Sequence, residues 1–102
     1  MNILVLGSGA KDHAVTWLFS KSRRISGLFT APGNAGTAML GTNLHDVDIA
    51  SPQSVAEACL EHGISYVFAG TEIPLASGVP DHLRAVGIRT FGTSHSTFRL
   101  EG

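Results

Sequence analysis

The chain has 102 residues, of which 43% are hydrophobic and 15% are charged, and its formal net charge is −1. This apolar content is enough for one folded domain and excludes an intrinsically disordered chain. The lack of a surplus of lysine and arginine excludes a dedicated nucleic-acid-binding protein. The single cysteine, Cys59, excludes a disulfide framework and a cysteine-rich zinc site, and we interpret it as a small buried hydrophobe.

Strand and helix patterns alternate from the N-terminus. Residues Ile3–Leu6 form a short apolar run before Gly7, which is typical of a strand buried on both faces. The next segment, Ala10–Lys21, has helical spacing. The residues expected along its apolar stripe are Ala10, Ala14, Trp17, Leu18 and Lys21.

A second strand is predicted over Ile25–Ala31, just before Pro32 and Gly33. The small residues of the segment 34–42 indicate a loop. Val47–Ile49 predicts a short third strand.

Helix signals are strongest in the middle of the chain. Ser51 and Pro52 are typical of an N-cap and a first helical residue, and Gly63 suits the left-handed residue that ends a helix. The residues expected on or beside one face of this helix are Val55, Ala56, Cys59, Leu60 and His62. Ile64–Ala69 follows as the clearest strand of the chain.

The last third of the chain repeats the pattern. Ser77–Val86 predicts a helix ended by Gly87, and Ile88–Phe91 predicts a strand. Thr93 or Ser94 would then cap a helix that has hardly begun at residue 102. We therefore expect 1–102 to be one N-terminal domain of a longer protein.

The order of elements predicts an α/β domain. Its sheet would be open and mostly parallel, with about five strands, helices on both faces and right-handed crossovers. The apolar run after Met1 is too short for a signal peptide or a membrane span, so we expect a cytoplasmic protein that does not insert in a membrane.

Ligands of open parallel sheets bind at the carboxyl ends of the strands, where this sequence places loops of small and polar residues. The first loop, 7–10, joins a strand to a helix whose N-terminal N–H groups could bind an anion. Asp12 stands where a dinucleotide fingerprint needs glycine, and Asp12-His13-Ala14 replaces the Gly-Lys-Ser/Thr of a P-loop. The loop fits an anion site or simply a tight turn.

Three polar side chains at the same edge are candidate ligand contacts. Asn34 and Thr37 could hydrogen-bond a sugar or a phosphate, although a loop of turn residues is the simpler interpretation. Glu72 follows a buried strand and precedes Pro74. Its carboxylate could accept two ribose hydroxyls, or could be a surface charge or a helix cap.

Four segments match the sequence motifs of one protein family, in the family's order and over essentially the whole chain. They are Gly7-Ser8-Gly9-Ala10-Lys11-Asp12-His13-Ala14, Ala31-Pro32-Gly33-Asn34-Ala35-Gly36-Thr37, Gly70-Thr71-Glu72-Ile73-Pro74-Leu75, and Phe91-Gly92-Thr93-Ser94 with Leu100-Glu101-Gly102. Together they resemble the N-terminal domain of the glycinamide ribonucleotide synthetase (phosphoribosylamine–glycine ligase) family, in the ATP-grasp superfamily.

The chain departs from the family pattern at five positions. Ala10, Lys11 and Asp12 replace glycine, arginine and glutamate, and Thr71 and Thr93 each replace proline. The Ala10 methyl group and the loss of the bidentate guanidinium at Lys11 both bear on substrate affinity.

The resemblance implies a Rossmann-like domain that precedes the ATP-grasp domains of a ligase joining glycine to phosphoribosylamine in purine biosynthesis. It implies that ATP and Mg²⁺ (or Mn²⁺) bind to the later domains, so that this fragment binds neither and is inactive alone. Its partners would be phosphoribosylamine and those remaining domains. The implied substrate-binding residues are Gly9, Ala10, Lys11, Asn34, Gly36, Thr37 and Glu72, with no catalytic or metal-binding residue in the fragment.

Two alternatives stay open. The chain could be the same domain of another purine-pathway ATP-grasp ligase. It could also be a non-catalytic Rossmann module that binds a sugar phosphate or a nucleotide.

Overall fold

Two apolar strands, β1 (Asn2–Gly7) and β4 (Ile64–Ala69), lie at the centre of the sheet. The computed structural model describes residues 1–70, 74, 76–93 and 98–99. It pairs these two strands in parallel, with Leu4 opposite Val67, and both side chains are fully buried. A strand that is covered on both faces needs a continuous apolar run, and both segments supply one.

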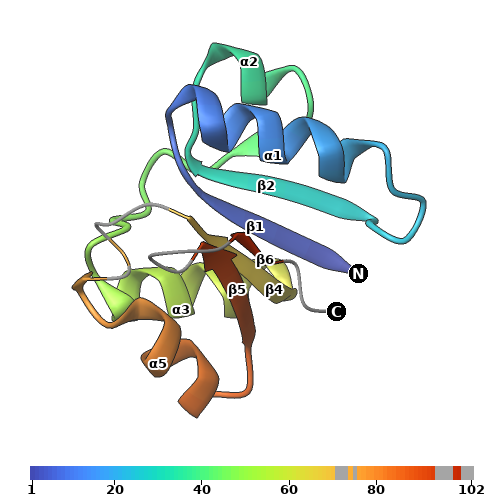
Figure 1. Cartoon of the computed structure of the whole chain (residues 1–102). Helices are drawn as coiled ribbons and strands as arrows, with labels where there is room; N and C mark the ends of the chain where they lie inside the picture. Colours follow the sequence, from blue (N-terminus) through green and yellow to red (C-terminus); the bar gives the residue numbers. More distant parts are fainter. Residues whose placement is uncertain (71–73, 75, 94–97, 100–102) are drawn as a thin grey trace.

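Four further strands extend the sheet on either side of this pair (Figure 1). On the β1 side lie β2 (Gly27–Pro32) and β3 (Thr42–Asn43), and on the β4 side lie β5 (Arg89–Thr93) and β6 (Phe98–Arg99). All neighbours are parallel except β5 and β6, which are antiparallel. The expected α/β fold with about five parallel strands is confirmed.

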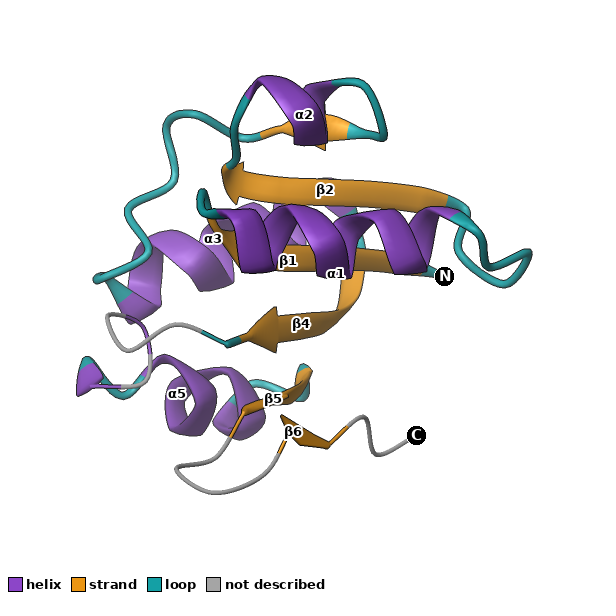
Figure 2. Ribbon diagram, turned by 45° about the horizontal axis from the view of Figure 1, so that its top comes forward, coloured by secondary structure: helices purple, strands orange, loops and turns teal. Residues whose placement is uncertain are grey.

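Helices cover both faces of the sheet (Figure 2). Helix α1 (Ala10–Ser20) lies on one face. Helices α3 (Pro52–His62) and α5 (Val79–Ala85) lie on the other. A single turn, α2 (Ala35–Ala38), follows β2. This arrangement leaves the loops after β1 and β2 next to each other at the carboxyl edge.

The apolar clusters on the two faces differ in size. Beneath α3 and α5, twelve buried residues from β1, β2, β4, the two helices and Ile88 just before β5 form one core. The α1 side has three, Val5, Val15 and Phe68, extended by Phe19 and Phe91. The Phe19 ring centroid lies 6.3 Å from that of Phe68 and 5.9 Å from that of Phe91, both edge to face. The fold therefore depends mainly on the core beneath α3 and α5.

The predicted ends of α3 are confirmed. The Ser51 hydroxyl accepts the Ser54 N–H at 3.2 Å, and Pro52 occupies the first turn. Gly63 ends the helix with φ +63°, a left-handed conformation that favours glycine.

The expected third strand at Val47–Ile49 is wrong. The strand beside β2 is β3, which pairs Thr42 with Phe29. Val47 and Ile49 instead pack against the core beneath α3, because an apolar side chain in a connection can be buried without joining a sheet. The loop expected over 34–42 also contains the helical turn α2.

The helix expected from Thr93 or Ser94 onward is also wrong where the structure describes it. Residues 94–97 and 100–102 lie outside the described residues. Phe98 pairs antiparallel with Thr93 in β5. Among the described residues, no parallel strand pairs with the outer edge of β5, and β6 pairs with it at Gly92 and Thr93.

Helix α1 turns the apolar stripe named above away from the sheet. Its buried residues are Asp12, Val15 and Thr16, whereas Trp17 is 48% and Leu18 is 55% exposed. The Thr16 hydroxyl donates to the Asp12 carbonyl oxygen at 2.7 Å. Because the helix backbone satisfies this hydroxyl, a polar residue can face the sheet, and the bulkier apolar side chains point outward.

Among the helices that the structure describes, none combines the length and the apolar character needed to cross a bilayer.

Cys59 lies in the core beneath α3, as predicted, and burial raises the pKa of its thiol from 9.0 to about 11. Because the thiolate is the reactive form, we expect the folded protein to resist a thiol reagent such as DTNB at about pH 8, and to react at once in guanidinium chloride. Rapid labelling of the native protein would contradict this placement.

The same shift has a consequence for stability. The unfolded thiol ionises first as the pH rises above 9, so the free energy of unfolding should fall between about pH 9 and 11. Cys59→Ala has no thiol to ionise at this position, so this contribution to the fall in the free energy of unfolding should be absent. Urea unfolding of both proteins across this range measures it.

Candidate functional site

The turn after β1 is shaped by Gly7 and by the carboxylate of Asp12. Gly7 has φ +143°, and a Cβ atom there would overlap the Asp12 carboxylate. Asp12 Oδ2 in turn accepts the N–H of Gly9, the N-cap of α1, at 3.1 Å. The carboxylate thus lies against the backbone of the turn, and only glycine at residue 7 leaves room for it.

Asp12 is 3% exposed, and its second oxygen, Oδ1, has no hydrogen-bond partner among the described residues. A buried acceptor without a donor is costly, and native proteins rarely contain one without a reason. Sequence reasoning treated Asp12 only as a residue that breaks other motifs. An acidic residue at the third position of a helix was the available signal, because it is the usual partner of an N-cap N–H.

The loop after β2 is closed by a capping box. Asn34 Oδ1 accepts the Thr37 N–H at 2.9 Å, and Thr37 Oγ1 accepts the Asn34 N–H at 2.8 Å. Thr37 is fully buried. In this conformation its hydroxyl holds the loop and does not face a ligand. The spacing of Asn34 and Thr37, three residues apart, is the capping-box signal that the sequence interpretation left unused.

Asn43, on β3, completes this loop, and sequence reasoning missed it. Its Nδ2 donates to the Asn34 carbonyl oxygen at 2.8 Å, and its Oδ1 lies 2.7 Å from Thr37 Oγ1. A Cβ atom at Gly33, which has φ +79°, would overlap the Asn43 side chain. No local pattern marks Asn43, because the contact depends on β3 pairing with β2.

The two loops are joined to each other. Asn34 Nδ2 donates to the Ser8 carbonyl oxygen at 2.8 Å, and the Gly33 N–H donates to the Gly7 carbonyl oxygen at 3.0 Å. This contact follows from the pairing of β1 with β2, in which Gly7 lies opposite Pro32. The two loops that the sequence placed at the same edge of the sheet are therefore adjacent.

Gly36 and His13 fix the distance between α2 and α1. A Cβ atom at Gly36 would overlap the His13 imidazole ring. His13 is half-buried, and we interpret it as a packing residue between the two helices. Gly36 therefore allows α2 to pack closely against α1 at the carboxyl edge of the sheet.

Gly9, Ala10 and Lys11 are exposed at the start of α1. Lys11 Nζ donates to the Gly70 carbonyl oxygen at 2.9 Å, so this cation lies across the carboxyl end of β4. Glu72, the remaining candidate, lies outside the described residues, as does Thr71.

These exposed groups favour an anion. The first N–H groups of a helix have no partner within the helix, and they carry a partial positive charge. Gly9 N–H is engaged by Asp12, and Lys11, whose Nζ donates to the Gly70 carbonyl oxygen, adds a positive charge beside the following N–H groups. A phosphate group matches this set in charge and in hydrogen-bonding capacity.

The described residues include no group of three or more histidines, cysteines or acids that could hold a metal ion.

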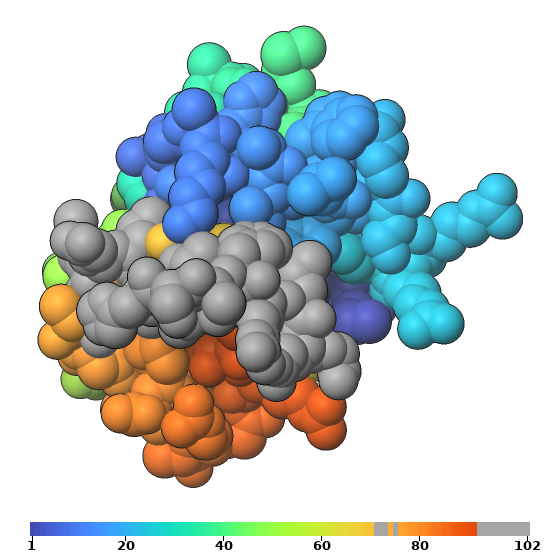
Figure 3. Space-filling model, in the orientation of Figure 1, coloured from blue at the N-terminus to red at the C-terminus, as the bar shows by residue number. Residues whose placement is uncertain are grey.

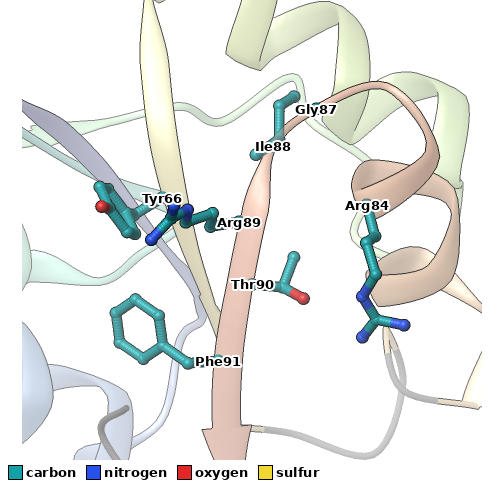
Figure 4. Close-up of a pocket in the computed structure, with 7 residues that line it drawn as sticks. All are labelled: Tyr66, Arg84, Gly87, Ile88, Arg89, Thr90 and Phe91. Atoms are coloured by element: carbon teal, nitrogen blue, oxygen red, sulfur yellow. The ribbon is translucent and has the colours of Figure 1, made fainter. Parts of the chain in front are cut away.

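A separate hollow lies beside β5, away from these loops (Figure 4). Tyr66, Arg89 and Phe91 lie on one side of the strand, and Thr90 and Arg84 lie on the other. Arg84 pairs with Asp81 at 3.2 Å on the open surface, where an ion pair adds little stability. The hollow brings no reactive groups together, and we do not assign it to the functional site.

Comparison with known proteins identifies relatives along the whole chain. Residues 1–101 match the family described as phosphoribosylglycinamide synthetase, N domain. The chain is 46% identical to a phosphoribosylamine–glycine ligase of Mycobacterium tuberculosis, 41% to that of Rhodopirellula baltica and 39% to that of Neisseria meningitidis.

These alignments cover 100%, 99% and 99% of this chain, but only 24%, 23% and 24% of the respective relatives. The chain thus spans about a quarter of the length of the relatives it matches.

We predict that Gly7→Ala destabilises the fold more than Gly78→Ala does. Both glycines have positive φ, but nothing lies within 4 Å of a Cβ atom at Gly78. Backbone strain alone costs about 1–2 kcal/mol. The overlap with Asp12 adds about 1–3 kcal/mol at Gly7. Urea unfolding of the two variants measures the difference.

A double variant separates the two causes. In the double variant Gly7→Ala, Asp12→Ala, the free energy of unfolding lost to the overlap should be recovered. The loss caused by backbone strain should remain. Equal destabilisation by Gly7→Ala and Gly78→Ala would show that the Asp12 carboxylate does not constrain the turn.

Proposed function

Because the chain belongs to the phosphoribosylglycinamide synthetase N-domain family, we propose that it is the N-terminal domain of an ATP-dependent ligase that joins glycine to 5-phosphoribosylamine. The observation that carries the proposal is the carboxyl edge of the sheet. There the Asn34 loop is hydrogen-bonded to the turn that opens α1, beside the exposed Lys11. The edge has the polarity expected of a site for a sugar phosphate.

Each candidate residue has a role in this proposal. The lack of a side chain at Gly9 would let the phosphate group approach the turn, and the N–H of Ala10 and the ammonium of Lys11 would bind it. Asn34 would border the sugar, and Gly36 and Thr37 would hold its loop in place. Glu72 would accept hydrogen bonds from ribose hydroxyls.

The proposed contribution to catalysis is positioning. The amine of phosphoribosylamine is the nucleophile, and it must reach the activated carboxyl carbon of glycine. Holding the sugar phosphate at a rigid edge converts a bimolecular encounter into a reaction between aligned groups. No proton transfer by a residue of this domain is needed for that role.

For ATP and Mg²⁺, the described residues offer no cluster of three or more metal ligands. We assign both to the rest of the polypeptide, which in the relatives is about three times as long as the matched segment. The 102-residue chain alone would therefore have no ligase activity.

The first test is substrate dependence in the full-length protein. Turnover of ATP should require both glycine and phosphoribosylamine. Turnover with a different amine or carboxylate acceptor would favour another purine-pathway ligase. Binding of a sugar phosphate without any turnover would favour a non-catalytic module.

We predict that Lys11→Met raises the KM for phosphoribosylamine in the full-length enzyme. A charged hydrogen bond contributes about 1.5–3 kcal/mol, so the expected rise is about 10- to 100-fold. Lys11→Arg should retain affinity because it keeps the charge. Steady-state kinetics with each substrate varied in turn make the measurement.

Arg23→Met is the matched control, since Arg23 is an exposed cation that follows the other end of the same helix. It should leave all three KM values unchanged. If Lys11→Met changed the KM values for ATP and glycine as much as that for phosphoribosylamine, Lys11 would support the fold and not the substrate.

We also predict that Glu72→Gln lowers kcat/KM for phosphoribosylamine and leaves the KM values for ATP and glycine nearly unchanged. The amide keeps the shape of the side chain but loses its charge and one acceptor. The same kinetic series tests this. Wild-type values for the sugar substrate would assign Glu72 to a structural cap.

A further inference from the structure

The outer face of α1 is apolar. It forms a shallow groove lined by Ala10, His13, Ala14, Trp17 and Leu18, which we call the α1 face. Both Trp17 and Leu18 are about half exposed. A helix that covers a sheet ordinarily turns its polar stripe to water. Here that stripe is replaced by large apolar side chains, while Asp12 and Thr16 face the sheet.

The other helices that cover the sheet do not share this pattern. The exposed side of α3 carries Gln53, Glu57 and Glu61. The exposed side of α5 carries the ion pair between Asp81 and Arg84. On α1, no charged residue lies on the exposed side between Lys11 and the end of the helix. In the space-filling view, the α1 segment forms part of the surface that faces the viewer (Figure 3).

Lys21 covers part of the α1 face. Its Nζ lies 5.1 Å from the centroid of the Trp17 ring. This contact holds the indole at the surface while leaving it half exposed. The face is therefore an ordered apolar surface.

We infer that the α1 face docks against another domain of the same polypeptide, the part that would carry ATP and the metal ion. This inference rests on the proposed function, because it assumes the longer ligase. The matched relatives are about four times as long as this chain, so in the proposed ligase most of the polypeptide would lie outside the structure. A surface with few charges matches an apolar surface on that remainder.

The small area of the α1 face favours a partner that belongs to the same polypeptide chain. An 11-residue helix is about 16 Å long and about 10 Å wide, so one side exposes roughly 160 Å². A stable contact between separate molecules needs about 800 Å² from each partner. A domain on the same chain has a high effective concentration, and the α1 face can form part of a larger interface with it.

The position of the face links docking to the substrate edge. Ala10 and His13 belong to the α1 face, and they also adjoin the turn at Gly9 and the loop at Gly36. A domain seated on α1 would therefore stand beside the proposed phosphoribosylamine site. In the proposed ligase, that domain would present activated glycine to the sugar amine.

The test uses hydroxyl-radical footprinting of the full-length protein, read by mass spectrometry at Trp17. We expect Leu18→Glu to weaken docking and to raise oxidation of Trp17 severalfold over wild type. Leu60→Glu is the matched control, because Leu60 is a 76% exposed leucine on α3. It should leave Trp17 oxidation at the wild-type rate. Ala14→Glu is a second, separate variant that places a charge on the α1 face. Circular dichroism checks that each variant is folded.

Three outcomes decide the proposal. Wild-type and Leu18→Glu proteins with equal Trp17 oxidation would overturn it. Protection of Trp17 that disappears on about a hundredfold dilution would also overturn it and assign the face to a second copy of the chain. Protection that is independent of concentration and lost in both α1 variants would support it.

This readout is separate from catalysis. If the full-length protein did not turn over ATP with glycine and phosphoribosylamine, the proposed function would fail. Protection of Trp17 in that protein would still establish the docking face. If turnover were observed while Trp17 stayed fully reactive, the function would stand and the docking proposal would fail.

Discussion

The side chain of Asn34 is the contact on which the proposed site depends. Its oxygen closes the loop after β2 through the Thr37 N–H, and its nitrogen joins that loop to the Ser8 carbonyl oxygen after β1. One amide thus ties two strand ends into a single rigid edge. A ligand that binds there does not have to order the loop first, so less of its binding energy is lost to entropy.

Asp12 sets the chemistry of the same edge. In a dinucleotide-binding turn, a glycine near this position lets the helix pack closely and lets the pyrophosphate approach the backbone. Here a buried carboxylate fills that space and accepts the Gly9 N–H, which removes one donor from any incoming anion. The remaining donors are fewer and lie next to Lys11. Such a turn suits one terminal phosphate better than a bridging pyrophosphate.

The elements that were predictable from sequence have their causes in local chemistry. The apolar runs of β1 and β4 and the caps of α3 at Ser51 and Gly63 need only neighbouring residues to be recognised. The third strand and the contacts of Asn43 depend on pairing between β2 and β3. No local pattern encodes that pairing, which is why sequence reasoning placed the strand at Val47–Ile49. The motifs located the loops of the site, but not the hydrogen bonds that join them.

The direction in which α1 turns its apolar stripe could not be predicted from the sequence, for a different reason. Helical periodicity locates an apolar stripe but does not say what covers it. In a domain that folds alone, the core usually covers such a stripe, but Trp17 and Leu18 are about half exposed. The structure puts Val15 and Thr16 on the sheet instead, where their smaller side chains fit above β1 and β2. An apolar stripe that the domain's own core does not use is the expected mark of a second interface, since burying it elsewhere recovers the hydrophobic free energy.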